Sequence, residues 1–489
     1  MPKWTDSRLD VAPLLRDWAS GTGPMYTRLA TAMRSAIERG ELLRGTRLPP
    51  ERPLADALEV SRTTVVLAYQ RLRDEGLVES RQGSGTWVRR RVGGASPPSR
   101  LEEQHRSFLT DSVTRAAAFE TEGTIGFMGA CLPGASVPLD EEWRAAEADV
   151  AELASGVGYS PQGLLALRRA IAADFERRGV PTSADEILVT TGAQQAIDLV
   201  SRLLVARGDS VVLEDPTYLG AIDALSLTGA ELVPVTAGAT GVAIRQAVER
   251  ASAALAYLVP TFQNPTGGVM AESDRREMAR LAEERGVAVL EDESLSDLSF
   301  GPEPPPPIAH YAPQASVLTV GSMSKLFWGG LRVGWVRAPR PLLPRLLRIK
   351  VVCDLSGSAL SQALAARLLL RREEVVRRRR QESKRRYRQL AELLRAALPE
   401  WSWTEPSGGL TLWARLPAPS AFELARVAPR YGVSIVPGPV HSPSHGHADR
   451  VRLPFVLEDE LLAEGIARLA RAWEACRHPA PDRRLGVIV

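Results

Sequence analysis

Lys325 is the residue of this chain with the most distinctive chemistry. The 489 residues contain only four lysines, Lys3, Lys325, Lys350 and Lys384, and nearly every other basic position is arginine. Lys325 lies among small and apolar residues in the run V-G-S-M-S-K-L-F-W-G-G-L-R-V-G-W, from 320 to 335. A primary amine can form a Schiff base with an aldehyde, whereas a guanidinium cannot, so the pattern indicates a chemical need for lysine here.

Three neighbouring side chains add what a phosphorylated aldehyde would need. Ser322 and Ser324 place hydroxyls beside the amine, and Arg332 places a fork-shaped cation seven residues after it. Hydroxyls and a guanidinium are suited to hold a phosphate, so the stretch is consistent with pyridoxal phosphate. A surface lysine in a Gly/Ser loop explains the same residues equally well, and the context along the chain has to separate the two interpretations.

Composition is that of an ordinary globular protein with a net charge of +3. The charge is uneven, because 13 arginines and 8 acidic residues lie between Pro24 and Arg91, which predicts a polyanion partner for that segment. The three cysteines, Cys131, Cys353 and Cys476, are odd in number and far apart, which argues against a disulfide framework or a Cys-type metal site. The N-terminus is unlike a signal peptide and no apolar run approaches the ~20 residues of a membrane span, so we predict a cytoplasmic protein without a metal.

The basic segment has the pattern of a winged helix-turn-helix. Apolar side chains recur every four positions from Met25 to Ile37, which predicts a helix that ends at Gly40. A short helix fits residues 51–58, and Ser61 has the chemistry of an N-cap for a second helix. That helix would have Val65, Tyr69 and Leu72 on one face, Gly76 past its end, and a hairpin after it from strands at 77–80 and 86–88 around Gly83-Ser84-Gly85.

This stretch resembles the winged helix of the GntR family of transcription regulators. The resemblance rests on R-L-P-P-E-R, V-S-R-T-T-V, A-Y-Q-R-L-R-D-E-G and R-Q-G-S-G-T-W-V, and it implies a DNA-binding domain at residues 1–92 with its core at 24–91. The implied contacts to double-stranded DNA are Arg52, Ser61, Arg62, Thr63 and Thr64, with Arg81, Gly83 and Ser84 in the wing. Pro50 stands where the family usually has serine, so a cap hydroxyl is missing. A winged helix that contacts protein is the alternative.

The rest of the chain has the pattern of an α/β fold. Residues 93–118 have the composition of an interdomain linker, and the body follows at 119–489. Short apolar runs alternate with amphipathic helical stretches, which predicts a mainly parallel sheet with both faces covered. The runs lie at 187–190, 210–213, 256–259, 288–290 and 317–320. In such sheets ligands bind beyond the carboxyl ends of the strands.

Chemically informative residues follow each of these runs in turn. The first leads into T-T-G-A-Q-Q, a glycine before a helix start that suits a phosphate. Tyr218 follows the second run and could stack on a flat cofactor, and Asn264 follows the third on a tight turn. Asp292 follows the fourth, where a carboxylate could keep a pyridine nitrogen protonated, and the fifth leads into Lys325. Five such signals at successive strand ends favour a cofactor site.

The body resembles the fold-type I aminotransferases, which use pyridoxal 5'-phosphate. The matching residues are Tyr159 with Pro161 and Gly163, T-T-G-A-Q-Q, E-D-P-T-Y, Q-N-P-T-G-G, E-D, G-S-M-S-K with Arg332, and R-V-R-L-P-F. The resemblance implies a large subdomain at about 160–345 and a small one mainly at 346–489. The resemblance implies that Lys325 attaches the cofactor covalently, Asp292 contacts its pyridine nitrogen, Asn264 contacts its ring hydroxyl and Tyr218 stacks on its ring. The phosphate would be bound by Ala193, Gln194, Ser322 and Arg332. Arg452 would bind a substrate carboxylate, and Tyr159 would reach the site of the neighbouring subunit.

Together the two domains resemble the MocR/GabR branch of the GntR regulators over nearly the whole chain. The resemblance implies a transcription regulator that senses a small amino compound, and a head-to-tail homodimer. The alternatives are an active aminotransferase with an accessory DNA-binding domain, and a body that serves only as a dimerisation scaffold. Ser294 replaces the tyrosine usual two residues after the aspartate, which argues against full turnover, whereas Q-N-P-T-G is closer to working aminotransferases.

Two further stretches are predicted to have no functional role. His441, His445 and His447 lie in P-V-H-S-P-S-H-G-H-A-D, which predicts a polar loop because no acidic or cysteine partner stands at metal-ligand spacing. Arginines are dense from Arg371 to Arg388 and glutamates are interleaved with them, which predicts the solvated face of a long helix. A second DNA contact is the alternative for that helix.

Overall fold

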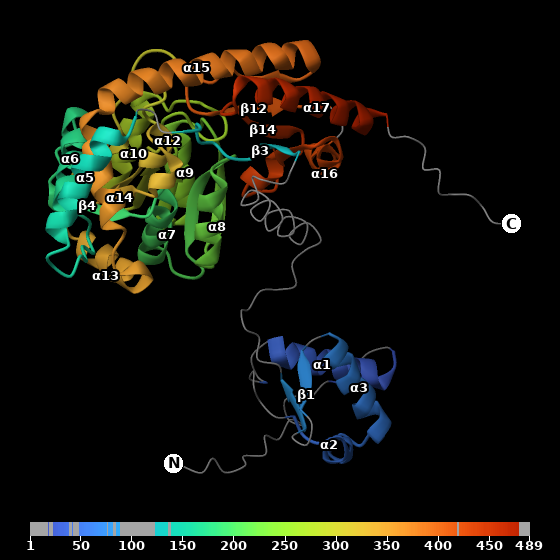
Figure 1. Cartoon of the computed structure of the whole chain (residues 1–489). Coiled ribbons are helices and arrows are strands. Elements are labelled where there is room, and N and C mark those ends of the chain that lie inside the picture. Colours follow the sequence, from blue (N-terminus) through green and yellow to red (C-terminus); the bar gives the residue numbers. More distant parts are fainter. Residues whose placement is uncertain are drawn as a thin grey trace. The chain divides into compact units, whose positions relative to one another are not determined.

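Two compact units make up the chain, Met1–Glu103 and Gln104–Val489. The computed structural model describes residues 18, 23–38, 42, 48–75, 77–81, 85–88, 123–134, 138–417 and 420–478. Figure 1 draws the helices and strands of the first unit in blue and those of the second from teal through green to red. No helix within these ranges is long and apolar enough to cross a membrane.

The first unit is a small helical cluster with a two-stranded hairpin. Its elements are α1 (Met25–Glu38), α2 (Glu51–Ala57), α3 (Arg62–Asp74), β1 (Val78–Arg81) and β2 (Gly85–Val88). The helices enclose a core that includes Leu29, Leu54, Val65, Tyr69 and Leu72. The apolar spacing read from the sequence therefore marks the buried faces correctly, except at Met25, which is 43 % exposed.

The N-terminal ends of α2 and α3 are as predicted. The Ser61 hydroxyl accepts a hydrogen bond from the Thr64 amide at 3.1 Å, which caps α3. Pro50 occupies the N-cap of α2 and provides no side-chain cap. Strands β1 and β2 pair antiparallel from Val78 opposite Val88 to Arg81 opposite Gly85, which confirms the hairpin. Gly40, Gly76, Gly83 and Ser84 lie outside the described residues.

The second unit is built on a seven-stranded sheet in the order β4-β10-β9-β8-β7-β5-β6. Its strands are β4 (Ile187–Thr190), β5 (Ser210–Asp215), β6 (Glu231–Thr236), β7 (Leu255–Leu258), β8 (Ala288–Asp292), β9 (Val317–Ser322) and β10 (Gly334–Arg337). Only β10 runs antiparallel to its neighbours, so the predicted mainly parallel sheet is confirmed. Strands β6 and β10 were not among the predicted runs.

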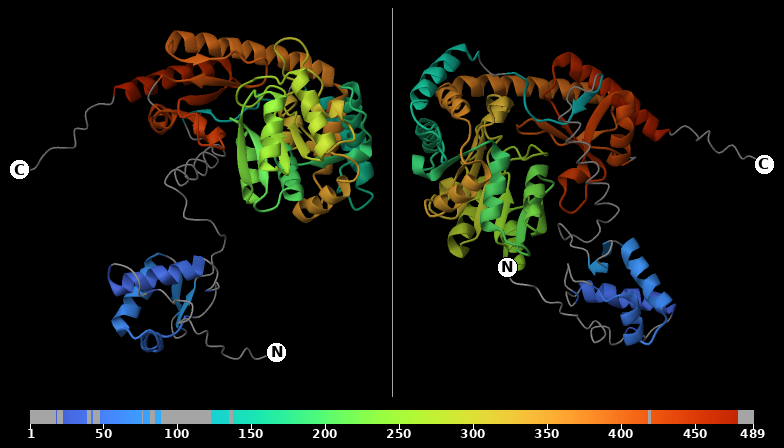
Figure 2. Two further views of the ribbon diagram at one scale, coloured as in Figure 1. Left: turned by 180° about the vertical axis from the view of Figure 1, so that it is seen from behind. Right: turned by 60° about the horizontal axis from the view of Figure 1, so that its bottom comes forward.

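Helices cover both faces of this sheet, as Figure 2 shows from two further directions. They are α5 (Asp140–Leu153), α6 (Leu165–Arg177), α7 (Ala193–Leu204), α8 (Leu219–Leu227), α9 (Gly241–Ala251), α10 (Glu272–Arg285), α13 (Leu343–Asp354) and α14 (Ala359–Leu370). Alternate strand residues enter two different cores: Val212 packs in one, and Val211 and Leu213 pack in the other. Strands such as β4, β7 and β8 are buried on both faces and are therefore mostly apolar, which is why their sequences lack polar alternation, whereas the edge strand β6 is partly exposed.

A second sheet, in the order β11-β12-β14-β13-β3, carries the C-terminal part of the unit. Its strands are β3 (Ile125–Phe127), β11 (Ser402–Trp403), β12 (Thr411–Arg415), β13 (Val433–Pro437) and β14 (Arg450–Pro454). It packs with α15 (Arg372–Ala397), α16 (Ala421–Val427) and α17 (Asp459–Arg477) around a separate core (Figure 1). The parallel pairing of β3 with β13 brings residues just after β3 to this sheet.

Short turns join these elements and complete the course of the chain. They are α11 (Ile308–Tyr311), α12 (Met323–Leu326), η2 (Ala184–Glu186), η3 (Gly329–Leu331), η4 (Ala428–Tyr431) and η5 (Gly438–His441). Of these, α12 carries Lys325, directly beyond the carboxyl end of β9.

Candidate functional site

Lys325 lies in the helical turn α12 and not in an open loop. Its amine donates hydrogen bonds to the Ala130 carbonyl at 2.9 Å and to the Cys131 sulfur at 3.3 Å. The Ser322 hydroxyl caps the turn by accepting from the Ser324 amide at 3.1 Å. The alternative of a surface lysine in a Gly/Ser loop is therefore wrong, because the amine is half-buried and aimed at the segment after β3.

A buried arginine from α15 fixes the end of this turn. Arg379 donates to the carbonyls of Leu326 and Phe327, both at 3.0 Å, and to the carbonyl of Gly134 at 2.9 Å. Arg379 and Arg386 are each only 3 % exposed, so the prediction of a fully solvated arginine face is wrong for these two positions. The Leu326 and Phe327 carbonyls, which the end of α12 leaves without helical partners, explain why the Arg379 guanidinium is buried there.

The start of α7 forms a cradle for an anion. Gly192 has φ +115° and precedes Ala193 and Gln194, whose backbone N–H groups lie at the positive end of a twelve-residue helix. Arg332 donates to the Thr191 carbonyl at 2.9 Å, and a Cβ added at Gly192 would lie 3.0 Å from its Nη2 atom. The glycine therefore lets the guanidinium approach the helix start, as phosphate binding would require.

Asp292 ends β8 in a buried, hydrogen-bonded position. Its carboxylate accepts from the Tyr257 hydroxyl at 3.1 Å and from the Ser294 amide at 2.9 Å. Burial raises the pKa of Asp292, and these hydrogen bonds oppose the rise. A cationic partner would stabilise the ionised carboxylate, so this site suits a protonated pyridine nitrogen.

Tyr218 is buried and is influenced by the charges of both Asp292 and Arg452. Burial raises the pKa of Tyr218 to about 12, the negative charge of Asp292 adds to the rise, and the positive charge of Arg452 opposes it. The Cys131 thiol raises the same pKa, and its sulfur accepts from the Lys325 amine at 3.3 Å. Four of the predicted residues, together with Cys131, thus share one site.

Arg452 lies on β14 opposite Trp413 of β12. Its guanidinium donates to the Met128 carbonyl, and burial lowers the pKa of Arg452 to about 10. A buried cation without a carboxylate ion pair among the described residues is costly, and a carboxylate ligand would offset that cost. The arrangement fits the predicted contact to a substrate or effector carboxylate.

The predicted polar histidine loop is wrong for His441, which is 1 % exposed. Its ring nitrogen Nδ1 lies 3.2 Å from the Thr217 carbonyl, and its ring packs edge-on against Trp413. Burial, with the charge of Arg452 as a second cause, lowers the pKa of His441 well below its usual range, so the imidazole is neutral. His447 contacts Asp215 at 3.1 Å. No group of metal ligands occurs within the described residues.

Several predicted site residues have a buried polar atom without a hydrogen-bond partner in the described part of the chain. Within the described ranges, Asn264 Oδ1, Gln194 Oε1 and Arg452 Nε make no hydrogen bond although they are buried. Buried polar groups normally find partners, so these atoms indicate that the site is completed by a polar ligand. Together with Lys325, Asp292 and the anion cradle, they fit pyridoxal phosphate and an amino compound with a carboxylate.

Tyr159 is not brought to this site within one subunit. It is 65 % exposed, on the connection between α5 and α6. Of the predicted DNA contacts, Arg52, Ser61, Arg62 and Thr63 are exposed. The Ser61 and Thr64 hydroxyls bond each other at 2.8 Å, and Arg62 donates to Glu51 at 3.0 Å. The side chain of Arg81 lies outside what the structure describes.

Cys131, Tyr257, Arg379 and His441 were missed as site residues. Cys131 contacts Lys325 although 194 positions separate them in the sequence, so no local pattern predicts this contact. Tyr257 lies in the apolar strand β7, so its sequence context predicts a core residue and not a site residue. His441 could have been found from its place shortly before the strand that carries Arg452.

A methyl group at Gly220 should weaken cofactor binding. A Cβ there would lie 2.1 Å from Gln194 Oε1 and 2.7 Å from the Tyr218 ring, so Gly220→Ala must displace both. We expect about tenfold weaker binding of pyridoxal phosphate, from the loss of roughly 1.4 kcal/mol. Gly156→Ala is the matched control, because its nearest contact would be a backbone oxygen at 3.7 Å. Equal affinity of both variants in a cofactor titration would contradict this assignment.

Comparisons with known proteins agree with this geometry. Residues 129–469 match the family described as aminotransferase class I and II, and residues 25–88 match the bacterial regulatory proteins of the gntR family. The HTH-type transcriptional regulator YisV of Bacillus subtilis, itself uncharacterised, is 31 % identical over 80 % of this chain and 84 % of its own. The probable rhizopine catabolism regulatory protein MocR of Rhizobium meliloti is 31 % identical over 67 % of this chain and 68 % of its own.

A solved structure gives the same result for the body. LysN, an alpha-aminoadipate aminotransferase from Thermus thermophilus complexed with N-(5'-phosphopyridoxyl)-L-leucine, has a TM-score of 0.69 and 31 % sequence identity, over 76 % of this chain and 97 % of its own. The fold is that of a fold-type I aminotransferase joined to a winged helix-turn-helix. The chain belongs to the GntR family of transcription regulators, in the MocR branch that carries an aminotransferase-like body. Its cofactor is pyridoxal 5'-phosphate.

Proposed function

We propose that this regulator binds operator DNA through its first unit and senses a small amino acid through the site around Lys325. The observation that carries this proposal is the pairing of a half-buried lysine amine with a buried Arg452 that has no carboxylate ion pair within the described residues. One group would meet the amino end of an effector and the other its carboxylate. LysN is named for alpha-aminoadipate, an amino acid, which supports that ligand class.

The cofactor, when bound, supplies an aldehyde to which an amine can be joined and a ring that accepts electrons. The proposed roles of the chain's own residues follow from their positions. Asp292 holds a proton on the pyridine nitrogen, Asn264 contacts the ring hydroxyl and Tyr218 stacks on the ring. Ala193, Gln194, Ser322 and Arg332 bind the phosphate at the start of α7. Lys325 would hold the cofactor covalently, and its amine lies where an effector amine would also have to bind.

The proposed DNA surface is the exposed start of α3 with Arg52 of α2. Arg62 and Thr63 would approach base edges there, while Ser61 and Thr64 position the helix by capping it. Arg81, Gly83 and Ser84 of the wing remain proposed contacts. Arg62 must leave Glu51 to bind DNA, and that exposed ion pair is weak enough to exchange.

Substitution of Arg62 should weaken operator binding without unfolding the domain. We expect Arg62→Ala to cost about 1–3 kcal/mol at the operator, and deletion of residues 1–92 to abolish specific binding while cofactor binding persists. Arg73→Ala is the control, because Arg73 lies in the last turn of the same helix and bonds Gln70 and Ser80. A footprint left by the truncated chain would refute the DNA assignment.

An active aminotransferase is the second candidate. The complete set of Lys325, Asp292, Asn264 and Arg332 favours it, and Ser294 in place of the usual tyrosine argues against it. Sustained conversion of an amino acid and a 2-oxo acid, lost in Lys325→Ala, would establish this alternative. In both candidates the Lys325 amine would be the group that accepts and returns a proton at this site.

We also propose that two copies form a head-to-tail dimer in the cytoplasm, where the proposed DNA partner lies. Apolar side chains are exposed at Val157, Tyr159, Val352 and Leu355, with exposed fractions between 41 and 85 %. The Ser160 amide donates to the Ser356 hydroxyl at 3.0 Å, so the two segments are adjacent, and we propose that their exposed side chains form one apolar patch. Contact through this patch would bring Tyr159 to the cofactor site of the neighbouring subunit. Sedimentation of the full chain as a monomer at micromolar concentration would rule this out.

A further inference from the structure

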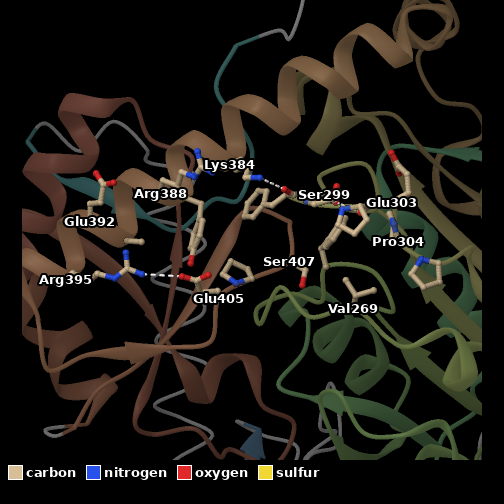
Figure 3. Close-up of a pocket in the computed structure, with 18 residues that line it drawn as sticks. Val269, Ser299, Glu303, Pro304, Lys384, Arg388, Glu392, Arg395, Glu405 and Ser407 are labelled. Atoms are coloured by element: carbon tan, nitrogen blue, oxygen red, sulfur yellow. Dashed lines mark hydrogen bonds and ion pairs between the residues drawn. The ribbon is translucent and has the colours of Figure 1, made fainter.

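We propose a second ligand site, separate from the one around Lys325, that binds an anion with a flat apolar body such as an aromatic carboxylate. The site is a pocket of about 580 Å³. It lies between α15 with residues 405–407 on one side and residues 299–305 on the other (Figure 3). None of its eighteen lining residues is among the proposed cofactor or effector contacts, so this proposal does not depend on the proposed function.

The pocket has the size and the apolar surface of a small-molecule site. Volumes of about 300–1,000 Å³ are typical of such sites. Phe300 and Tyr387 line it as a stacked pair, with ring centroids 5.5 Å apart and planes at 22°. Phe262 and several prolines complete the apolar surface. A flat ring system could lie against these groups and remove them from water.

The charges on the pocket wall favour an anion. Lys384 and Arg388 are one helical turn apart on α15, and Figure 3 shows both at the pocket. Lys384 donates to the Phe300 carbonyl, which does not neutralise it, and Arg388 has no ion pair within the described part of the chain. Most other described cations along this helix are paired, including Arg380 with Glu303 and Arg385 with Asp459.

Two of the three carboxylates that line the pocket are already paired with other arginines. Glu303 is held by Arg380, and Glu405 is paired with Arg395 at 3.4 Å. Glu392 is the third lining carboxylate and is exposed. The Tyr387 hydroxyl is buried and makes no hydrogen bond within the described residues, although Trp403 and Glu405 lie near it. Among the described residues, the pocket lining therefore has two cations without an ion pair, Lys384 and Arg388, against one unpaired carboxylate, Glu392, around an apolar floor.

The experiment uses the full-length holo-protein and the fluorescent anion 1-anilinonaphthalene-8-sulfonate. We expect saturable binding that weakens at least tenfold in the double variant Lys384→Gln/Arg388→Gln, because two charge-assisted contacts to the sulfonate are lost. Arg385→Gln is the matched control, since Arg385 lies on the same helix, pairs with Asp459 and does not line the pocket. Benzoate should compete with the probe in the wild type.

The absorption spectrum of the cofactor is recorded in the same titration. An unchanged spectrum during binding supports a site apart from Lys325. Equal affinity of the double variant and the wild type would overturn the proposal, as would a probe that binds only by displacing the cofactor. The uncharged analogue N-phenyl-1-naphthylamine should bind both proteins equally, and a tenfold loss for this probe too would show that the variant has lost the pocket's shape. In that case the single variant Arg388→Gln is tested with both probes, because Arg388 is exposed and bonds nothing in the described structure. Weaker binding of the anionic probe alone would support the proposal, and unchanged binding of that probe would overturn it.

Discussion

Lys325→Ala should remove the visible absorption band of the cofactor completely and abolish the response to amines. Among the described residues of the site, Lys325 has the only primary amine, the group that can form a Schiff base with the cofactor aldehyde, and it lies half-buried beyond β9 beside Ala130 and Cys131. Absorption spectra of the purified proteins, titrated with a panel of amino acids and amines, provide the measurement. In the wild type, one amine should shift the band stoichiometrically.

The same titration separates the two candidate functions. A shifted band that persists after a 2-oxo acid is added identifies a sensor, and a band that cycles while product accumulates identifies an enzyme. Lys3→Ala is the control, because Lys3 belongs to the first compact unit. A band that survives in Lys325→Ala would contradict the assignment of the lysine, and the lack of any band in the wild type would favour the scaffold alternative.

Arg452→Gln should weaken binding of the effector about 100-fold while the cofactor stays bound. The guanidinium is buried, 7 % exposed, and donates to the Met128 carbonyl, so it is held rigidly for a carboxylate. Losing hydrogen bonds to a charged group costs about 1.5–3 kcal/mol, and the upper end applies in a buried site. The measurement is the midpoint of the spectral shift with the effector amino acid, repeated with its decarboxylated amine.

The decarboxylated amine makes the test specific for the carboxylate. The amine should bind the wild type more weakly than the amino acid does, because it lacks the carboxylate that Arg452 contacts. For the same reason, its affinity should be the same for the wild type and for Arg452→Gln. Arg415→Gln is the matched control, since Arg415 lies on the neighbouring strand β12 and pairs with Asp449 at the surface. A loss of affinity for the amine as large as that for the amino acid would show that Arg452 shapes the pocket and does not bind the carboxylate.

Local patterns in the sequence determined much of the architecture. Apolar runs fixed the buried strands, because a strand covered on both faces must be apolar throughout. They also placed Asp292 and Lys325, since residues that directly follow parallel strands meet at one edge of a sheet. In the first unit, the Ser61 cap and the apolar spacing of the helices are likewise local signals, which depend on hydrogen bonds and side chains a few residues apart.

Only the tertiary structure decided which distant residues complete the site. Cys131 reaches Lys325 because β3 pairs with β13 in the second sheet, and no pattern near either residue encodes that pairing. Arg379 and Arg386 look solvated in sequence, because a charged helix face does not reveal which of its cations will meet unpaired carbonyls. His441 is buried because the turn before β14 folds against Thr217 and Trp413. Long-range packing selects such contacts, and it acts on the assembled sheet rather than on the local sequence.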